Sequence, residues 1–378
     1  MNFRTAESAT EGQSDKLADQ ISDAVVDAII ANDPTASISC ETLVSNGFCI
    51  VAGEIRTETY APIAEIARSV FRDSGYTDGA YGFDYRSAGV ITAVNEQSAE
   101  LSAKREGGRT AANDSCAAIG FACAETPEFM PLEVVSAHKL TRQMARARKD
   151  GVLPFLLSDG KAQVSVAAEG GAARITHIVI SAQHTRNCSL DELREGVMEE
   201  VVKVALPLDF TANARVQINP AGSFVIGGPQ SDSGMTGRKV ASDSYGMVAP
   251  SGGSLSGKDP LKIDRAGAYM ARYLAKNIAA AGVTDRVMVS LAYEIGALEP
   301  VAIDVLLDFP SSDTARSRLS REITAFIAQN FDLSAGGIAK KLDLFKPLYR
   351  ASSVYGTFGR KGFGWEETSD VEVFKRFL

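Results

Sequence analysis

The sequence predicts an α+β protein built from three similar domains, each an antiparallel sheet with helices on one face. The first observation behind this prediction is a hairpin-then-helix unit that occurs three times at wide spacing. The second is size and composition: 378 residues, 45% hydrophobic and 23% charged, suit a globular chain of two or three domains. A chance series of hairpins in one large domain is the alternative.

The first unit lies in the N-terminal third. Two alternating segments, 38–44 and 48–55, flank Ser45-Asn46-Gly47, which is a hairpin turn signal. Apolar residues with helical spacing follow over 63–71. The pattern predicts a hairpin followed by an amphipathic helix.

The second unit lies in the middle third, where segments 162–168 and 174–183 flank a Glu-Gly-Gly turn at 169–171. The next helix is predicted to begin at Ser189, because Glu192 three residues on completes a capping box.

The third unit pairs segments 286–294 and 300–307 around Gly296, and a helix is predicted over 315–331. Its order of elements repeats that of the first two units.

A long helix is predicted near the N-terminus, over residues 15–30. Aspartates recur on it at every fourth position, at Asp15, Asp19, Asp23 and Asp27. We expect most of this stripe to be a solvated surface. Asp15 lies in the first turn, where a carboxylate can hold a metal ion or favour the helix N-terminus through the macrodipole.

Net charge and cysteine content limit the classes of function that the sequence allows. The formal net charge is −8 and the pI is near 5.2, which argues against a broad nucleic-acid-binding surface. The five cysteines are odd in number and scattered, as expected for reduced thiols. No apolar stretch approaches the length of a membrane span. We therefore expect a cytoplasmic protein without nucleic-acid or membrane partners.

Two glycine-rich segments, 227–239 and 251–265, contain clustered cations that include Arg238, Lys239 and Lys258. Glycine lets backbone N–H groups approach phosphate oxygens, and the cations neutralise their charge. Aspartates among them suggest Mg²⁺, which shares its ligands with phosphates; they are Asp232, Asp259 and Asp264. Two ordinary polar surface loops are the alternative.

These loops and the N-terminal segment resemble those of the S-adenosylmethionine synthetase (methionine adenosyltransferase) family. The resemblance extends from Thr5 to about Trp365. The strongest ordered matches lie at 218–220, 224–229, 236–239 and 256–260. Further matches lie at 11–12, 15–16, 355–356 and 358–360.

The resemblance implies three α+β domains related by pseudo-threefold symmetry, in agreement with the repeat. The approximate segments are 1–12 with 115–225, then 13–114, then 226–378. It also implies a homodimer or homotetramer with active sites between subunits.

The resemblance further implies a reaction. The methionine sulfur attacks C5′ of ATP and expels the triphosphate, which is cleaved to pyrophosphate and phosphate. Because sulfur is already a good nucleophile, catalysis rests on alignment and on stabilising charge on the leaving group. The residues implied to act on the triphosphate are Gln13, Lys161, Arg238, Lys239 and Lys258.

Other roles are implied in the same way. ATP contacts are expected from the last four of these residues and from Asp159, Phe224 and Asp232. Amino-acid substrate contacts are expected from Glu54, Gln97, Asp114, Asp232 and Lys262. Mg²⁺ is expected at Asp15 and Asp264, and K⁺ at Glu41.

The chain departs from the family pattern near the reacting centre. Gln13 and Ser14 stand where the family motif has His and Pro, and that histidine is the group expected to stabilise O5′ of the leaving triphosphate. The lid segment between Gln97 and Asp114 is shorter than usual, and Ser115-Cys116 replaces Gln-Gly.

Three interpretations stay open at this point. The first is an ordinary or slow methionine adenosyltransferase, in which Gln13 still donates a neutral hydrogen bond. The second is a paralogue that adenosylates a different sulfur or nitrogen nucleophile. The third is a non-catalytic nucleotide-binding partner subunit, which the intact cations and carboxylates disfavour.

Overall fold

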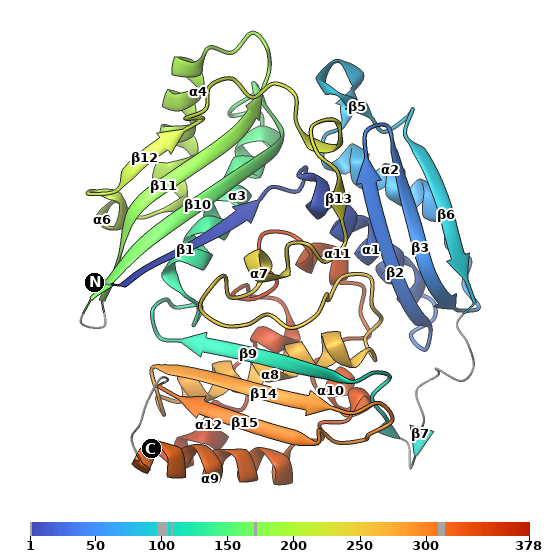
Figure 1. The fold of residues 1–378 in the computed structure, drawn as a ribbon, viewed down its shortest axis with the longest axis vertical. Coiled ribbons are helices and arrows are strands. Elements are labelled where there is room, and N and C mark those ends of the chain that lie inside the picture. Colours follow the sequence, from blue (N-terminus) through green and yellow to red (C-terminus); the bar gives the residue numbers. More distant parts are fainter. Residues whose placement is uncertain (1, 97–104, 107–108, 170–171, 309–313) are drawn as a thin grey trace.

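The fold consists of three larger sheets with their helices, arranged around a central region (Figure 1). The computed structural model describes residues 2–96, 105–106, 109–169, 172–308 and 314–378. Gln97, one of the predicted site residues, lies outside the described residues.

The first sheet joins the N-terminal strand to the middle of the chain. Its strands are ordered β1 (Asn2–Ala9), β10 (Leu156–Glu169), β11 (Ala172–His184) and β12 (Arg215–Ile218). Helix α3 (Leu132–Lys149) packs on β1 and β10, and α4 (Leu190–Val197) adds its apolar side chains to the same core.

The second sheet carries the first predicted hairpin. Its order is β13 (Gly234–Met235), β2 (Ser37–Ser45), β3 (Phe48–Arg56) and β6 (Gly89–Asn95). Helices α1 (Ser14–Ile30) and α2 (Ile63–Asp73) pack on one face of it.

The third sheet is ordered β15 (Ala302–Leu307), β14 (Arg286–Tyr293) and β9 (Cys116–Cys123). Helix α8 (Ile263–Ala280) packs on β9 and β14, and α9 (Thr314–Asn330) packs on β15. A Cβ on Gly120 of β9 would lie 1.9 Å from the backbone of Ala271, so glycine permits the close approach of α8.

The remaining strands and helices are short. They are β4 (Thr77–Asp78), β5 (Phe83–Asp84), β7 (Arg105–Glu106), β8 (Arg109–Thr110), α5 (Lys203–Ala205), α6 (Leu208–Thr211), α7 (Val240–Asp243), α10 (Ala335–Lys341), α11 (Tyr349–Ser352) and α12 (Val371–Phe374). None of the helices in the described part of the chain is long and apolar enough to cross a membrane.

The predicted α+β fold with three hairpin-then-helix units is confirmed. The units are β2–β3 with α2, β10–β11 with α4, and β14–β15 with α9. Most strand pairs of these sheets are antiparallel, as expected, but β6 runs parallel to β3 and β12 runs parallel to β11. In both cases the helix after the hairpin carries the chain back across the sheet, which places the next strand parallel.

The chain crosses between the sheets. Strand β1 pairs with β10, which supports grouping residues 1–12 with the middle of the chain. The predicted segment 115–225 nevertheless gives β9 to the third sheet, and the predicted segment 226–378 gives β13 to the second. The domain boundaries stay an approximate prediction.

The expected solvated acidic stripe on α1 is wrong. Asp15, Asp19 and Asp23 are buried, because loops from the second half of the chain pack over this face of the helix. Their carboxylates accept hydrogen bonds from backbone N–H groups of these loops, at Met235, Gly237 and Gly257 respectively. Asp27, which is half-buried, accepts from the N–H groups of Tyr349 and Arg350.

Candidate active site

The predicted site residues form two groups, and the first lies at the N-terminus of α1. Asp15 Oδ1 accepts a hydrogen bond of 3.0 Å from the N–H of Met235, and Asp15 Oδ2 accepts one of 2.7 Å from Lys239 Nζ. Burial alone would raise the pKa of Asp15, but these hydrogen bonds outweigh it and the pKa is lowered. Asp15 is therefore an anion that a cation must balance.

Gln13 is the N-cap of α1. Its Oε1 accepts a hydrogen bond of 3.1 Å from the N–H of Lys16, and its Nε2 donates one of 3.2 Å to Asp15 Oδ2. Ser14 Oγ donates a hydrogen bond of 2.7 Å to the carbonyl of Asp232, a bond that a proline could not make. Gln13 and Ser14, the two departures from the family motif, therefore both make hydrogen bonds that support the local structure.

The other cations of this group are accessible. The Arg238 side chain is 54% exposed, and its Nη1 lies 3.6 Å from Asp15 Oδ1. Lys161 on β10 pairs with Glu7 on the neighbouring strand and is also about half exposed. Contacts with carboxylates hold Arg238 and Lys161 in place, and about half of each side chain stays exposed.

Asp159, on β10, and Phe224, in the segment after β12, lie on the side of the first group next to the first sheet. Asp159 Oδ2 accepts a hydrogen bond of 2.8 Å from the N–H of Gly228, and burial raises the pKa of Asp159 to about 6. The N–H of Phe224 donates to His184 Nε2 at 3.1 Å, and the N–H of His184 donates to the Phe224 carbonyl at 2.9 Å. His184 therefore fixes the backbone of Phe224.

Gly228 has a positive φ of 58°, and a Cβ there would lie 1.9 Å from Tyr76 Oη. That hydroxyl donates to the carbonyl of Gly12. Only glycine lets the 227–229 segment pack this closely against the loop before Gln13.

The second group lies at the N-terminus of α8. Lys258 Nζ donates a hydrogen bond of 2.9 Å to Asp264 Oδ2, and both side chains are mostly buried. Lys262 is 6% exposed, and its Nζ lies 3.4 Å from Ser37 Oγ. Glu54 lies opposite Ser39 in the sheet, and Ser39 forms a bridge with Lys258.

Two further predicted residues are exposed. Asp114 accepts a hydrogen bond from the N–H of Ser115, and its neighbour Asn113 accepts one of 2.9 Å from the N–H of Ile263. Glu41 is exposed on β2. Asp259 is not available as a metal ligand, because both of its oxygens accept backbone hydrogen bonds, from Ile38 and Leu261.

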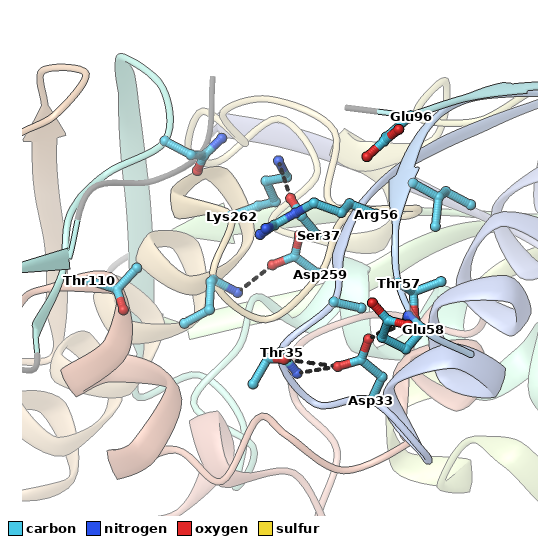
Figure 2. A pocket seen from close by; sticks show the side chains of 14 residues that line it. Asp33, Thr35, Ser37, Arg56, Thr57, Glu58, Glu96, Thr110, Asp259 and Lys262 are labelled. Atoms are coloured by element: carbon cyan, nitrogen blue, oxygen red, sulfur yellow. Dashed lines mark hydrogen bonds between the residues drawn. The ribbon is translucent and has the colours of Figure 1, made fainter. Parts of the chain in front are cut away.

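A cavity of about 820 Å³ adjoins the second group (Figure 2). Lys262, Asn113 and Glu96 line it from different segments, together with Ser37 and Arg56. Sequence reasoning found Lys262 but missed Arg56 and Glu96. The available signal was period-two alternation, which places Arg56 on the same face of β3 as Glu54.

The two groups are separate within one chain. β13 of the first group pairs with Leu43 on β2, whereas Lys258 of the second pairs with Ser39. Four residues of strand span about 13 Å. Among the described residues, no three or more His, Cys, Asp or Glu side chains gather to form a metal site.

Three family models match consecutive parts of the chain. They describe the N-terminal domain of S-adenosylmethionine synthetase over residues 1–99, its central domain over 109–224 and its C-terminal domain over 226–367. A protein named S-adenosylmethionine synthase from Wolinella succinogenes is 49% identical over 381 residues, covering 99% of this chain and 97% of the relative. The chain belongs to the S-adenosylmethionine synthetase family.

Other relatives agree. The S-adenosylmethionine synthase of Helicobacter hepaticus is 50% identical over 99% of this chain, and that of Nitratiruptor sp. is 49% identical over 99%. In each case 97% of the relative is covered. Membership of the S-adenosylmethionine synthetase family confirms the resemblance inferred from the motifs.

Proposed function

We propose that this protein is a methionine adenosyltransferase, which forms S-adenosylmethionine from L-methionine and ATP and cleaves the released triphosphate to pyrophosphate and phosphate. The observation that carries the proposal is near-full-length identity of 49–50% to proteins named S-adenosylmethionine synthase. The retained cations and carboxylates agree with it. The two alternatives, another nucleophile and a non-catalytic subunit, are not favoured.

In this proposal the chain's own cations receive the triphosphate. Arg238 and Lys161 stand at the first group about half exposed, and Lys239, mostly buried against Asp15, lies beside Arg238. A departing polyphosphate can pair with these cations. Lys258 supplies a further cation from the second group. These charges stabilise the oxygens that become more negative as the C5′–O5′ bond breaks.

Gln13 is positioned as a donor near the leaving oxygen. Its amide nitrogen has two protons and uses one on Asp15, which leaves the other for a substrate oxygen. A neutral amide cannot strengthen its donation by carrying charge, as a histidine can.

The carboxylates present suit Mg²⁺ that is shared with phosphates. Asp15 and Asp264 are separate, and each is paired with a lysine that a triphosphate can draw away. Mg²⁺ commonly binds through one or two carboxylates and completes its ligands with phosphate oxygens and water. When bound, it would neutralise charge on the triphosphate. Glu41, exposed on β2, is the proposed K⁺ ligand.

We assign the amino-acid substrate to the second group. Lys262 points into the 820 Å³ cavity and can pair with a carboxylate (Figure 2). Glu54 and Asp114 are exposed carboxylates near that cavity and can pair with an ammonium. Gln97 is assigned to the same subsite from the family motif, and Asp232 completes the proposed set from the first group.

A second copy of the chain would bring the two groups together. The helix-free face of the second sheet carries apolar residues in register, with Met235 beside Leu43 and Ile50 beside Ile91. Leu43, Ile91 and Met235 are 37%, 53% and 43% exposed. Exposed apolar faces of this kind mark interaction sites. We infer a homodimer, or a homotetramer made of two such dimers, with each active site shared between subunits.

We also infer a cytoplasmic location. All five cysteines are free, and four are buried. Burial raises the pKa of Cys40 and of Cys49 to about 12, so these thiols are poor nucleophiles and behave as core residues.

The proposal is tested by incubating the protein with ATP, Mg²⁺, K⁺ and L-methionine and identifying products by mass spectrometry. We expect S-adenosylmethionine with pyrophosphate and phosphate. A parallel panel of other thioethers and amines serves as the comparison. An adenosylated product only from another nucleophile would replace methionine in the proposal, and no product from any would contradict the enzyme assignment.

A further inference from the structure

A second cavity, of about 470 Å³, lies between α3 and the segment 355–363 that follows α11. It shares no residue with the candidate active site. Four cations line it, and these are Lys139, Arg142, Arg360 and Lys361. In a chain of net charge −8, this is a local excess of positive charge.

The cavity lacks the anions that would balance these cations. Its one carboxylate, Glu128, pairs with Lys139 at 2.8 Å. Arg142 and Lys361 are exposed, and within the part of the chain that the structure describes neither has an acidic partner. Among the described residues, the positive charges of Arg142, Arg360 and Lys361 therefore face the cavity without a carboxylate in direct ion-pair contact.

Arg360 shows this lack of balance most clearly. Its Nη2 donates a hydrogen bond of 2.8 Å to the carbonyl of Ala351, and its guanidinium lies over the ring of Phe363. Its Nε is buried and has no hydrogen-bond partner. Burial and the neighbouring Arg142 together lower the pKa of Arg360 to about 10, although the carboxylates of Asp243 and Glu366 act in the opposite direction. An incoming anion would offset both costs.

The loop that presents Arg360 is held against α3 by its backbone. Tyr355, Gly356 and Gly359 all have positive φ, of 58°, 89° and 81°. A Cβ at position 356 would lie 2.3 Å from His138 Nδ1, so glycine is required there. Strained, closely fitted backbone of this kind is concentrated at functional sites. The 355–360 segment is also a family motif for which the proposed reaction has no use.

We propose that this cavity is a second anion site that binds a phosphoryl group, with the size and charge of pyrophosphate. Paired guanidinium groups match phosphate oxygens in geometry, and ammonium groups add charge. A volume of about 470 Å³ exceeds the needs of a single phosphate. The site is separate from the cations proposed to bind the triphosphate, which are called the cradle below and are Lys161, Arg238, Lys239 and Lys258. It does not depend on the proposed reaction.

A neighbouring groove provides the matched control. It shares Lys139 and Arg142 with the cavity and adds Arg146 and Lys203. These two cations have acidic partners, since Arg146 pairs with Asp150 and Lys203 with Glu199. Positive charge that is already balanced should contribute little to anion binding.

The test is calorimetric titration of pyrophosphate into the whole protein. We compare wild type with Arg142→Gln/Lys361→Gln, whose exposed positions should tolerate the change, and with Arg146→Gln/Lys203→Gln as control. To separate this site from the cradle, the titration is repeated in Arg238→Ala/Lys258→Ala. Orthophosphate and ADP titrations tell inorganic from nucleotide phosphate.

We expect two classes of pyrophosphate site in wild type. Arg142→Gln/Lys361→Gln should weaken one class by about tenfold or more, the change expected for losing charge-assisted hydrogen bonds. That class should persist in the control and in the cradle variant. Unchanged binding in Arg142→Gln/Lys361→Gln overturns the proposal, and so does loss of all pyrophosphate binding in Arg238→Ala/Lys258→Ala. Turnover measured on the same variants reports on the cradle independently.

Discussion

Asp15 and Asp23 lie on the same face of α1, yet their ion pairs differ. Each aspartate accepts a hydrogen bond from a backbone N–H of a loop in the second half of the chain and pairs with a cation from that region. Arg265, the partner of Asp23, has a side chain that is 1% exposed, whereas Lys239, the partner of Asp15, is 22% exposed.

This difference in the exposure of the cation distinguishes an ion pair that only stabilises the fold from one that a ligand can reach. The Asp23–Arg265 pair is enclosed, with Arg265 also lying 4.2 Å from the centre of the Tyr349 ring, so no ligand can compete for it. The Asp15–Lys239 pair opens toward exposed Arg238, so phosphate can take the lysine and a metal ion can take the carboxylate. Exposure of the cation decides which pair can act on a substrate.

The largest effect should come from breaking the enclosed pair. Asp23→Ala leaves Arg265 as a buried, uncompensated charge, and we expect unfolding to become easier by about 3–5 kcal/mol. Urea unfolding of the variant and wild type measures this. Lys346→Ala, which breaks an exposed pair with Asp343, is the control and should change stability by less than about 1 kcal/mol. If Asp23→Ala and Lys346→Ala lose similar free energies of unfolding, enclosure of an ion pair does not determine its contribution to stability.

The Asp15–Lys239 pair and the cations beside it are called the open site below. Substitution of its cations, and of Lys258, should reduce activity with little loss of stability. Arg238→Ala and Lys258→Ala should each reduce kcat/KM by a factor that corresponds to about 2–4 kcal/mol, because each removes a cation from the developing charge. The unfolding midpoint of Arg238→Ala should stay close to wild type, since its side chain is 54% exposed. Steady-state assays with methionine measure the loss. Unchanged turnover in both variants would reduce these loops to ordinary surface.

The sequence could not separate the two pairs. Asp15, Asp19, Asp23 and Asp27 have the same spacing, and periodicity alone predicted a solvated stripe for most of them. Their burial depends on loops more than two hundred residues away, which local patterns do not place. The cations were found because glycine-rich segments with clustered charge are a local signal, as were the three hairpins. Arg56 could have been found from strand alternation with Glu54, but Glu96 was missed because a cavity between distant segments has no local signal.

A third prediction concerns pH and Asp159, which lies beside the open site. Its pKa of about 6 is above the ordinary value near 3.8, so its ionisation costs stability in the folded state. The cost is absent below the unfolded pKa and grows until the pH exceeds the folded pKa. Asp159→Asn keeps an acceptor for Gly228 but removes the charge.

Between pH 4 and pH 7, the stability of Asp159→Asn relative to wild type should rise by on the order of 2–3 kcal/mol. Urea unfolding at four or five pH values measures the difference. Asp33→Asn is the control, because hydrogen bonds from Thr57 and its neighbours lower the pKa of that carboxylate below its ordinary value near 3.8. The contribution of this carboxylate to stability therefore changes mainly below pH 4, with the opposite sign, and should stay nearly constant between pH 4 and pH 7. A pH-independent difference at Asp159 would show that its carboxylate is not penalised by burial.

The sharpest test of the open site concerns Gln13, for which we expect only a small change in stability. A histidine can increase its donation by carrying charge as O5′ becomes negative, whereas glutamine offers a fixed neutral donor. If methionine attacks C5′, Gln13→His should raise kcat by up to about a hundredfold, the usual worth of one oxyanion donor. It should also cost roughly 1 kcal/mol of stability, because Gln13 Oε1 caps α1 at the Lys16 N–H.

Gln13→Ala separates these two contributions, since it removes both the cap and the donor. We expect it to lose the same stability as Gln13→His but to turn over more slowly than wild type. A rise in kcat for histidine together with a fall for alanine assigns the donor role to position 13. If neither variant changes kcat, the leaving oxygen is stabilised by Lys239 and Arg238 alone, and the amide of Gln13 serves only to cap the helix and hold Asp15.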